Sequence, residues 1–171
     1  TGLAVCCVQE QTPLGTGGAM RFAAQAVTEE WCLVCNGDSL CPADVTPLWS
    51  DAMQHHCEAA LLVARVADVR DCGSVVVDTD GRVRGFVEKG AAQGAGLVNA
   101  GVYCVRTAWA RTLPDRTPLS NERDVFPHMT DGRLRGVITT TPFLDIGVPE
   151  RLAQAEAFLH AHRFNPHTAT S

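Results

Sequence analysis

The hydrophobic positions along the chain form short runs, separated by stretches in which apolar residues recur at helical spacing. Runs rich in valine and small residues predict strands, whereas spacings of three to four residues predict helices. The expected strands lie at 3–10, 31–35, 59–66, 97–106 and 143–147, with a hairpin at 73–90, and the expected helices lie at 18–28, 42–57 and 149–162. This alternation predicts a three-layer α/β domain with a mixed, mostly parallel sheet.

Three of these segments carry more specific expectations. The run "WCLVC" at 31–35 is of the kind that is buried on both faces of a sheet. In the hairpin, Asp80 and Gly81 form a dipeptide that is typical of a tight primed turn. Leu152, Ala155 and Leu159 share one side of the final helix, which we therefore expect to be amphipathic.

Candidate functional residues follow from the expected sheet, because ligands of such sheets bind beyond the carboxyl ends of the strands. The segments to consider are those at which strands stop. They are 15–18, 36–38, 88–89, 99–101 and 145–147.

Length and charge narrow the class of protein. The chain has 171 residues, 46% of them hydrophobic, and a net charge of −5. This length favours a single domain, expected over 1–163 with a loose tail at 164–171. The acidic balance argues against nucleic acid or an anionic membrane as a partner, and the longest apolar runs are too short to span a bilayer. Because the sequence starts with Thr1 and an apolar run, we expect the native start to lie upstream.

The eight cysteines could indicate disulfides or a zinc site. Cys6, Cys7, Cys32, Cys35 and Cys104 fall inside apolar runs, where cysteine behaves as a small hydrophobic residue. The spacing of Cys32 and Cys35 suits a metal, but in a strand their thiols point to opposite faces. We therefore expect reduced thiols in a cytoplasmic protein.

Two aspartates are candidates for a metal site. Asp38 and Asp145 each follow an apolar run and have a glycine adjacent or two residues on. Mg²⁺ takes one or two carboxylates and completes its coordination with water and phosphate oxygens, so two aspartates from separate strand ends would suit it. The alternative is that both are ordinary turn residues.

Lys89 is the single lysine of a chain with thirteen arginines. A compact ammonium can meet a phosphate as a point charge, and the neighbouring Glu88 could accept hydrogen bonds from hydroxyl groups. The alternative is a solvated charge at the end of the hairpin, with Glu88 paired to an arginine.

The glycine-rich segment at 13–18, "PLGTGG", precedes an expected helix. It lacks the third glycine of a dinucleotide-binding loop and the Gly-Lys-Ser/Thr of a P-loop. Bare glycines allow a planar ring or a ribose to approach the backbone closely. A simple strand-to-helix turn is the alternative.

Six segments in order resemble the sugar-1-phosphate nucleotidyltransferases, in particular the bacterial heptose-1-phosphate and mannose-1-phosphate guanylyltransferases. They are "EQTPLGTGGAM", "VCNGDSL", "GFVEKG", "LVNAGVY", "SNERDVFP" and "FLDIGVPERLAQA". The resemblance implies a Rossmann-like, mixed sheet of the nucleotide-diphospho-sugar transferase fold. It also implies a reaction in which an oxygen of a sugar 1-phosphate attacks the α-phosphorus of a nucleoside triphosphate, GTP by this likeness, and pyrophosphate leaves.

The resemblance implies a role for individual residues as well. Asp38, Lys89 and Asp145 would be the catalytic set, in which the two aspartates hold a Mg²⁺ ion and Lys89 binds the phosphate of the sugar 1-phosphate. The residues that would lie against the nucleotide are Pro13, Leu14, Gly15, Thr16, Gly17 and Gly18. Those that would contact the sugar phosphate are Gly37, Glu88, Lys89, Asn99 and Gly101.

One element of the family pattern has no match. Family members begin with a Gly-Gly-x-Gly-Thr-Arg-Leu loop and a Pro-Lys-Pro that together grip the triphosphate, and no segment of this chain matches either. An N-terminally truncated nucleotidyltransferase, whose missing βα units would leave an exposed sheet edge, is the first hypothesis. A binding relative without turnover and a structural subunit of a larger assembly are the alternatives. Each allows a homo-oligomer.

Overall fold

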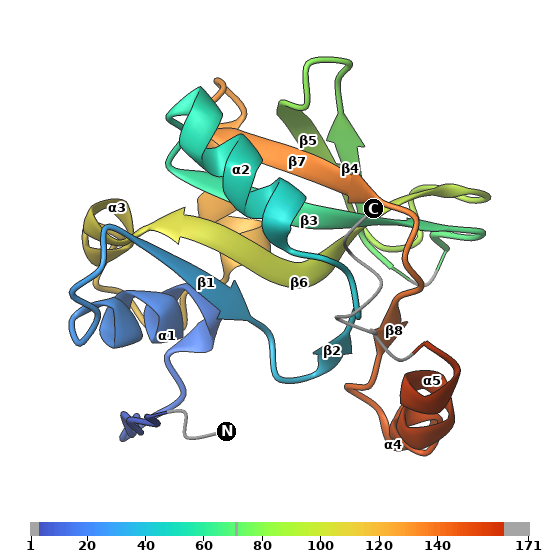
Figure 1. Ribbon diagram of the computed structural model, residues 1–171, viewed down its shortest axis with the longest axis horizontal. Helices are drawn as coiled ribbons and strands as arrows, with labels where there is room; N and C mark the ends of the chain where they lie inside the picture. Colours follow the sequence, from blue (N-terminus) through green and yellow to red (C-terminus); the bar gives the residue numbers. More distant parts are fainter. Residues whose placement is uncertain (1–3, 71, 163–171) are drawn as a thin grey trace, which may run out of the picture.

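The computed structural model describes residues 4–70 and 72–162 (Figure 1). Its helices are α1 (Gly15–Ala24), α2 (Thr46–His55), α3 (Thr107–Arg111), α4 (Pro149–Leu152) and α5 (Ala155–Ala161), with a π-helical turn η1 (Asn121–Val125) and a 3₁₀ turn η2 (Phe126–Met129). Its strands are β1 (Trp31–Cys35), β2 (Ser39–Leu40), β3 (Ala59–Val66), β4 (Ser74–Val77), β5 (Val83–Val87), β6 (Gly96–Arg106), β7 (Leu134–Thr139) and β8 (Leu144–Asp145). The expected tail at 164–171 lies outside the described residues.

A six-stranded sheet forms the centre of the molecule. Its order is β5-β4-β6-β3-β7, and β1 pairs with β6 as well. The long strand β6 has β3 along one side, and β1 and β4 along the other. β6 is antiparallel to all three of these neighbours, whereas β3 and β7 are parallel. It follows that β1, β3, β4 and β7 run in one direction and β5 and β6 in the other.

The expected mixed α/β fold is therefore confirmed, with one correction to its detail. Four strands share a direction, as the sequence predicts, but most hydrogen-bonded neighbours are antiparallel because β6 is inserted between β1 and β3. The connection from β5 to β6 is short, which brings β6 back against the direction of the helix-connected strands. A strand's direction in the sheet cannot be read from its apolar pattern.

Hydrophobic cores lie on both faces of the sheet. One contains Met20 of α1, Tyr103 of β6 and Phe126 of η2, and the other contains Leu48 of α2 and Cys104 of β6. Because successive residues of a strand point to opposite faces, neighbouring positions of β6 serve both cores. Helix α2 covers one face of the sheet in Figure 1, and α1 and α3 belong to the other, which gives the three expected layers.

Neighbours decide how deeply an apolar run is buried. In β3 the first six residues are buried, because the strand lies between β6 and β7. The expectation that 31–35 is buried on both faces is wrong. Strand β1 pairs only with β6 among the described residues, and its Leu33 is 41% exposed and its Cys35 exposed.

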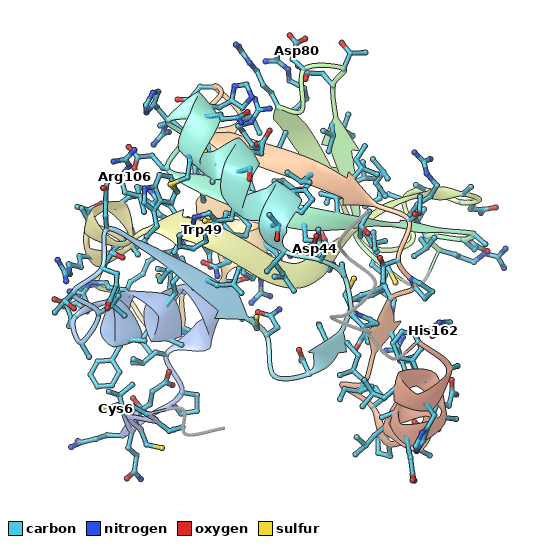
Figure 2. The ribbon with its side chains drawn as sticks, viewed as in Figure 1. Cys6, Asp44, Trp49, Asp80, Arg106 and His162 are labelled. Atoms are coloured by element: carbon cyan, nitrogen blue, oxygen red, sulfur yellow. The ribbon has the colours of Figure 1, made fainter. Side chains whose placement is uncertain are left out.

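Three further expectations are corrected. Residues 4–10 form no strand and are largely exposed, and Figure 2 shows Cys6 outside the packed layers. The hairpin turn is not primed: a three-residue loop is closed by the Gly81 N–H to the Asp78 carbonyl, and Gly81 alone in it has a positive φ, +80°. The final helix is two short helices, α4 and α5, with no buried residue and with Leu152 and Leu159 exposed.

Other elements differ in extent or were not expected. Helix α1 begins at Gly15 rather than at Gly18, and α2 begins at Thr46, with Pro47 rather than Pro42 in its first turn. The strand expected at 143–147 is confirmed as β8. Strands β2 and β7 were missed, and with them the β2–β8 and β3–β7 pairings that build the site described next and the edge of the sheet. Within the described residues, no helix is long and apolar enough to cross a bilayer.

Candidate active site

A pocket of about 460 Å³ brings together five of the residues expected from the sequence. It opens where β1 and β5 end and where β4 and β6 begin. The expected residues that line it are Asp38, Glu88, Lys89, Asn99 and Asp145. Residues from four separate parts of the chain therefore meet at one end of the sheet. Glu88, Lys89 and Asp145 lie at or just after strand ends, as the rule predicts. Asn99 does not: it is the fourth residue of β6, which runs antiparallel to its neighbours and begins at this end of the sheet.

The β2–β8 ladder is what brings the two aspartates together. Ser39 pairs with Asp145 in an antiparallel register, and the Ile146 N–H donates to the Asp38 carbonyl at 2.8 Å. Both carboxylates face Gly147: a Cβ at that glycine would stand 3.1 Å from Asp145 Oδ1 and 3.5 Å from Asp38 Oδ2. The glycine thus leaves open the space between the two carboxylates, which any side chain would fill.

The Asp145 carboxylate already has two partners. Its Oδ1 accepts a hydrogen bond from the Gly147 N–H at 2.8 Å, and its Oδ2 lies 2.9 Å from Nη2 of Arg151 in α4. Arg151 was not expected from the sequence. Its place as the fourth residue of the "VPERL" segment gave no signal of its own, because only the β8–α4 turn directs it back to the carboxylate.

Glu88 and Lys89 follow β5 directly and are exposed in the pocket wall. Among the described residues, neither side chain has an ion-pair or hydrogen-bond partner. The alternative in which Glu88 is paired to an arginine is thus not what the structure has. The Lys89 ammonium is available to an anion in the pocket.

Asn99 belongs to a network that the sequence did not reveal. The Glu122 carboxylate of η1 accepts from Tyr103 Oη at 3.1 Å and from Asn99 Nδ2 at 3.3 Å, and Asn99 also donates to Tyr103 Oη at 2.8 Å. Burial, with the nearby Glu122 charge, raises the pKa of the Tyr103 phenol, so the phenol stays protonated and a donor. The "SNERD" segment was part of the resemblance, and its first acidic residue, Glu122, was the available signal.

Two expected residues shape the site without lining this pocket. Gly101 has φ +72°, and a Cβ there would stand 2.8 Å from Ser39 Oγ, while its carbonyl accepts from the Asn36 N–H at 2.7 Å. It therefore fixes the β1–β2 turn that carries Asp38. Gly37 instead lines a second hollow of about 420 Å³ beside α1 and β1.

The glycine-rich segment packs against the chain itself. Leu119 accepts from the N–H groups of Gly17 at 2.8 Å and Gly18 at 3.4 Å, and donates its own N–H to Leu14. At Gly15, φ is +79° and a Cβ would stand 2.6 Å from the Leu119 carbonyl oxygen. This contact accounts for the glycines by close packing, and the exposed Pro13 lines neither hollow.

Thr16 is the member of that segment with a link to the pocket. Its hydroxyl donates to Glu122 Oε2 at 3.3 Å and accepts the Asn121 N–H at 2.8 Å. It also lines the second hollow, together with Asn36 and Gly37. Through Thr16 and Glu122 the two hollows share one hydrogen-bond network.

The chemistry that this pocket offers is charge placement. Two carboxylates face a common space, and one ammonium and the guanidinium groups of Arg123 and Arg151 line the same walls. Such a set can hold a divalent cation and anionic oxygens side by side. Among the residues the structure describes, no three or more His, Cys, Asp or Glu side chains form a metal-binding group.

Comparison with known proteins adds relatives to this geometry. The family model described as "Nucleotidyl transferase" matches residues 1–162. The chain is 32% identical over 161 residues to mannose-1-phosphate guanylyltransferase of Mycobacterium tuberculosis, a match that covers 92% of this chain and 45% of that protein. It is 30% identical to the D-glycero-alpha-D-manno-heptose 1-phosphate guanylyltransferase of Aneurinibacillus thermoaerophilus, with 91% of this chain and 67% of that protein covered.

A solved structure also matches this chain in its fold and sequence. The crystal structure of HddC from Yersinia pseudotuberculosis in complex with GMP-PN matches with a TM-score of 0.75 and 33% identity, over 87% of this chain and 64% of that one. The chain thus spans about half the length of the mycobacterial relative and about two thirds of the HddC chain.

Proposed function

The chain belongs to the nucleotidyl transferase family, and we propose that it transfers a guanylyl group from GTP to a sugar 1-phosphate of the mannose or heptose type, releasing pyrophosphate. The names of the relatives support guanine and these two sugars. The observation that carries the proposal is the meeting of Asp38 and Asp145 at Gly147, in a pocket that Lys89 also lines.

Mg²⁺ is the cation that we propose for the two aspartates. Two carboxylates with open space beside them suit an ion that keeps several waters and binds phosphate oxygens, rather than a closed protein cage. When bound, the ion would neutralise charge on the phosphates. Asp38 Oδ2 and Asp145 Oδ1 are the oxygens that face the shared space.

The side chains of the protein supply position and charge in this mechanism. Lys89 holds the phosphate of the sugar 1-phosphate so that one of its oxygens faces the α-phosphorus of GTP. A new oxygen–phosphorus bond forms, the bond from the α-phosphorus to its bridging oxygen breaks, and that electron pair leaves on pyrophosphate. No side chain needs to become covalently attached, because in-line placement and charge stabilisation lower the barrier.

The remaining expected residues are assigned to the two substrates. Glu88 and Asn99, which line the 460 Å³ pocket, would bind the sugar hydroxyls. Gly101 would support this subsite by fixing the β1–β2 turn. Thr16 and Gly37, on the second hollow, would lie toward the nucleotide. We also propose a cytoplasmic protein with small-molecule substrates and no nucleic-acid or membrane partner, in line with the net charge of −5.

One observation favours the second candidate, which is binding without turnover. The Gly17 and Gly18 amides, which could have met a phosphate at the start of α1, are taken by the Leu119 carbonyl. The described residues of this segment therefore provide no open backbone cradle for a triphosphate. In this second candidate, the pocket at Lys89 recognises a sugar phosphate and the chain performs no transfer.

The deciding experiment incubates the 171-residue chain with GTP, Mg²⁺ and mannose 1-phosphate or the heptose 1-phosphate, and follows pyrophosphate and the GDP-sugar. We expect both products in equal amounts and a loss of about 100-fold in rate for Lys89→Ala. Arg65→Ala is the matched control, because Arg65 is an exposed cation that does not line the pocket and has no ion-pair partner in the part of the chain that the structure describes.

The outcomes separate the two candidates. One outcome is sugar-phosphate binding, measured by calorimetry, that Lys89→Ala abolishes while no pyrophosphate is released. That result would rule out the transferase and support the second candidate, binding without turnover. If the chain neither releases pyrophosphate nor binds a sugar 1-phosphate, with any of the four common nucleoside triphosphates and with both sugars, both candidate functions are ruled out.

A further inference from the structure

A second polar pocket lies at the other end of the sheet. Its volume is about 270 Å³, and it is lined by His55, Arg82, Asp131, Gly132, Arg133 and Arg135. These residues come from the end of α2, the hairpin between β4 and β5, the segment that leads into β7, and the second residue of β7 itself. In Figure 2, Asp80 marks the tip of that hairpin, at the end of the molecule away from β8. None of these residues lines the candidate active site.

Two of the arginines are held in place by their own partners. Arg135 has a side chain only 7% exposed; it donates two hydrogen bonds to Asp51 and, from Nη2, one to the Asp80 carbonyl at 2.8 Å. Arg133 donates from Nε to Asp131 at 2.9 Å and from Nη2 to the His128 carbonyl. These contacts fix the guanidinium planes, so that their remaining N–H groups are already oriented.

Arg82 carries a charge that no carboxylate among the described residues pairs with. Its backbone is held at both ends, because the Arg82 N–H donates to Asp78 Oδ1 and its carbonyl accepts from the Asp78 N–H. Its guanidinium lies over the loop at Gly132, where a Cβ would stand 3.9 Å from Nη1. Among the described residues, this guanidinium has no carboxylate or hydrogen-bond partner.

The balance of charge in the pocket is therefore positive. Three guanidinium groups line the pocket, but the only carboxylate among its described lining residues is that of Asp131, which is paired to Arg133. Asp51, which does not line the pocket, is paired to Arg135. The imidazole of His55 also lines the pocket, with its Nε2 3.6 Å from Asp51 Oδ1. Like charges that converge on one hollow repel each other unless an anion separates them.

We propose that this pocket is a binding site for a phosphate-type oxyanion, namely inorganic phosphate, pyrophosphate or the phosphoryl group of a small metabolite. Guanidinium groups present paired N–H donors that match two oxygens of a phosphate. Arg82 closes onto the anion from the hairpin, while Arg133 and Arg135 meet it from the start of β7. The volume admits a phosphoryl group with a small substituent, but not a whole nucleotide-sugar.

The test uses Lys89→Ala as the starting protein, so that phosphate binding in the candidate active site is weakened. Phosphate and pyrophosphate are titrated separately at low ionic strength without Mg²⁺, by calorimetry and by amide NMR shifts. We expect saturable binding with shifts at Gly132 and Arg82. A further Arg82→Gln substitution should weaken binding about ten-fold, the loss of one charge-assisted interaction.

Arg65→Gln in the same Lys89→Ala background is the matched control, because it removes one exposed positive charge that lies outside the pocket and has no ion-pair partner within residues 4–70 and 72–162. An affinity that Arg65→Gln leaves unchanged and Arg82→Gln lowers supports the site. Equal losses in the two variants would mean general attraction to surface charge and would overturn the proposal. Absence of saturable binding in the millimolar range would overturn it as well. Because the starting protein lacks Lys89, failure of the proposed transferase would leave this result unaffected.

Discussion

Arg151 lies across from Asp145 with its Nη2 2.9 Å from Asp145 Oδ2, so one of the two candidate metal ligands is already paired to a cation of the protein. The other oxygen of that carboxylate faces the space shared with Asp38. Arg151 also lines the pocket, and its charge is therefore close to any phosphate bound there. A side chain in this place has two opposing effects: it competes with a metal ion for Asp145 and attracts an anionic substrate.

Replacing Arg151 should separate these two effects. We expect Arg151→Ala to strengthen Mg²⁺ binding up to about five-fold, because a partly exposed ion pair of at most about 1 kcal/mol no longer competes. The same change should weaken binding of the sugar 1-phosphate. Calorimetric titrations with each ligand measure both effects, with Arg65→Ala as the control. Weaker or unchanged Mg²⁺ binding in Arg151→Ala would contradict this account of the pair.

Asp38 and Asp145 should act on a single cation. We expect Asp38→Asn and Asp145→Asn each to weaken Mg²⁺ binding at least about ten-fold, since each removes one of two charged oxygen ligands. If both aspartates hold the same ion, the fold-loss of Mg²⁺ affinity in the double variant should be much smaller than the product of the fold-losses in the two single variants.

Titration of Mg²⁺ into the single and double variants measures this coupling. Asp115→Asn is a suitable control, because Asp115 is an exposed aspartate paired to Arg21 and does not line the pocket. Losses that multiply fully would place the two carboxylates on separate ions and would count against the shared site.

The Tyr103 hydroxyl should stabilise the fold through its hydrogen bonds. Tyr103→Phe keeps the ring that packs at 5.4 Å from Phe126 but removes a buried donor to Glu122 and an acceptor for Asn99. Leaving these polar groups with fewer partners should cost about 1–2 kcal/mol in the free energy of unfolding. Urea denaturation measures it, and Glu122→Gln, which retains an acceptor, should cost less. An unchanged free energy for Tyr103→Phe would show that water replaces the hydroxyl freely.

Local patterns predicted the strands well where the run was long and its ends were marked. The apolar run of β3 ends where the sequence indicates. The residues at or just after the ends of β1, β5 and β8 line one pocket, among them Asn36, Glu88 and Asp145. Those positions could be found because a chain that leaves a buried strand must turn, and its polar residues then face the same edge of the sheet.

The errors arose where distant contacts decide the structure. Residues 4–10 are apolar enough for a strand but pair with no described strand, and a lone segment cannot satisfy its backbone groups as a strand. The glycines at 15 and 17 fit against Leu119, more than a hundred residues away. Glu122 and Arg151 reach the pocket through η1 and the β8–α4 turn, and neither turn leaves a periodic signal in the sequence.

Buried cysteines should be unreactive while the protein is folded. Burial raises the pKa of Cys57 to about 11 and that of Cys104 to about 12, and only the thiolate is a nucleophile. At pH 8 both thiols should therefore remain protonated, whereas Cys6 and Cys7 are exposed. We expect iodoacetamide to label Cys6 and Cys7 within minutes and to label Cys57 and Cys104 only after unfolding in urea.

The raised pKa values of Cys57 and Cys104 also determine how the stability of the fold depends on pH. Because the folded protein holds these two protons more tightly than the unfolded chain, their contribution to stability is complete below the ordinary thiol pKa of about 8.5. It should decline as the pH rises through 11. The labelling of each cysteine is measured by peptide mapping with mass spectrometry at pH 8 and pH 10, and the Cys57→Ala variant shows how much of the total labelling comes from Cys57. Rapid labelling of Cys104 at pH 8 in the folded protein would contradict the closed packing of β6 against α2.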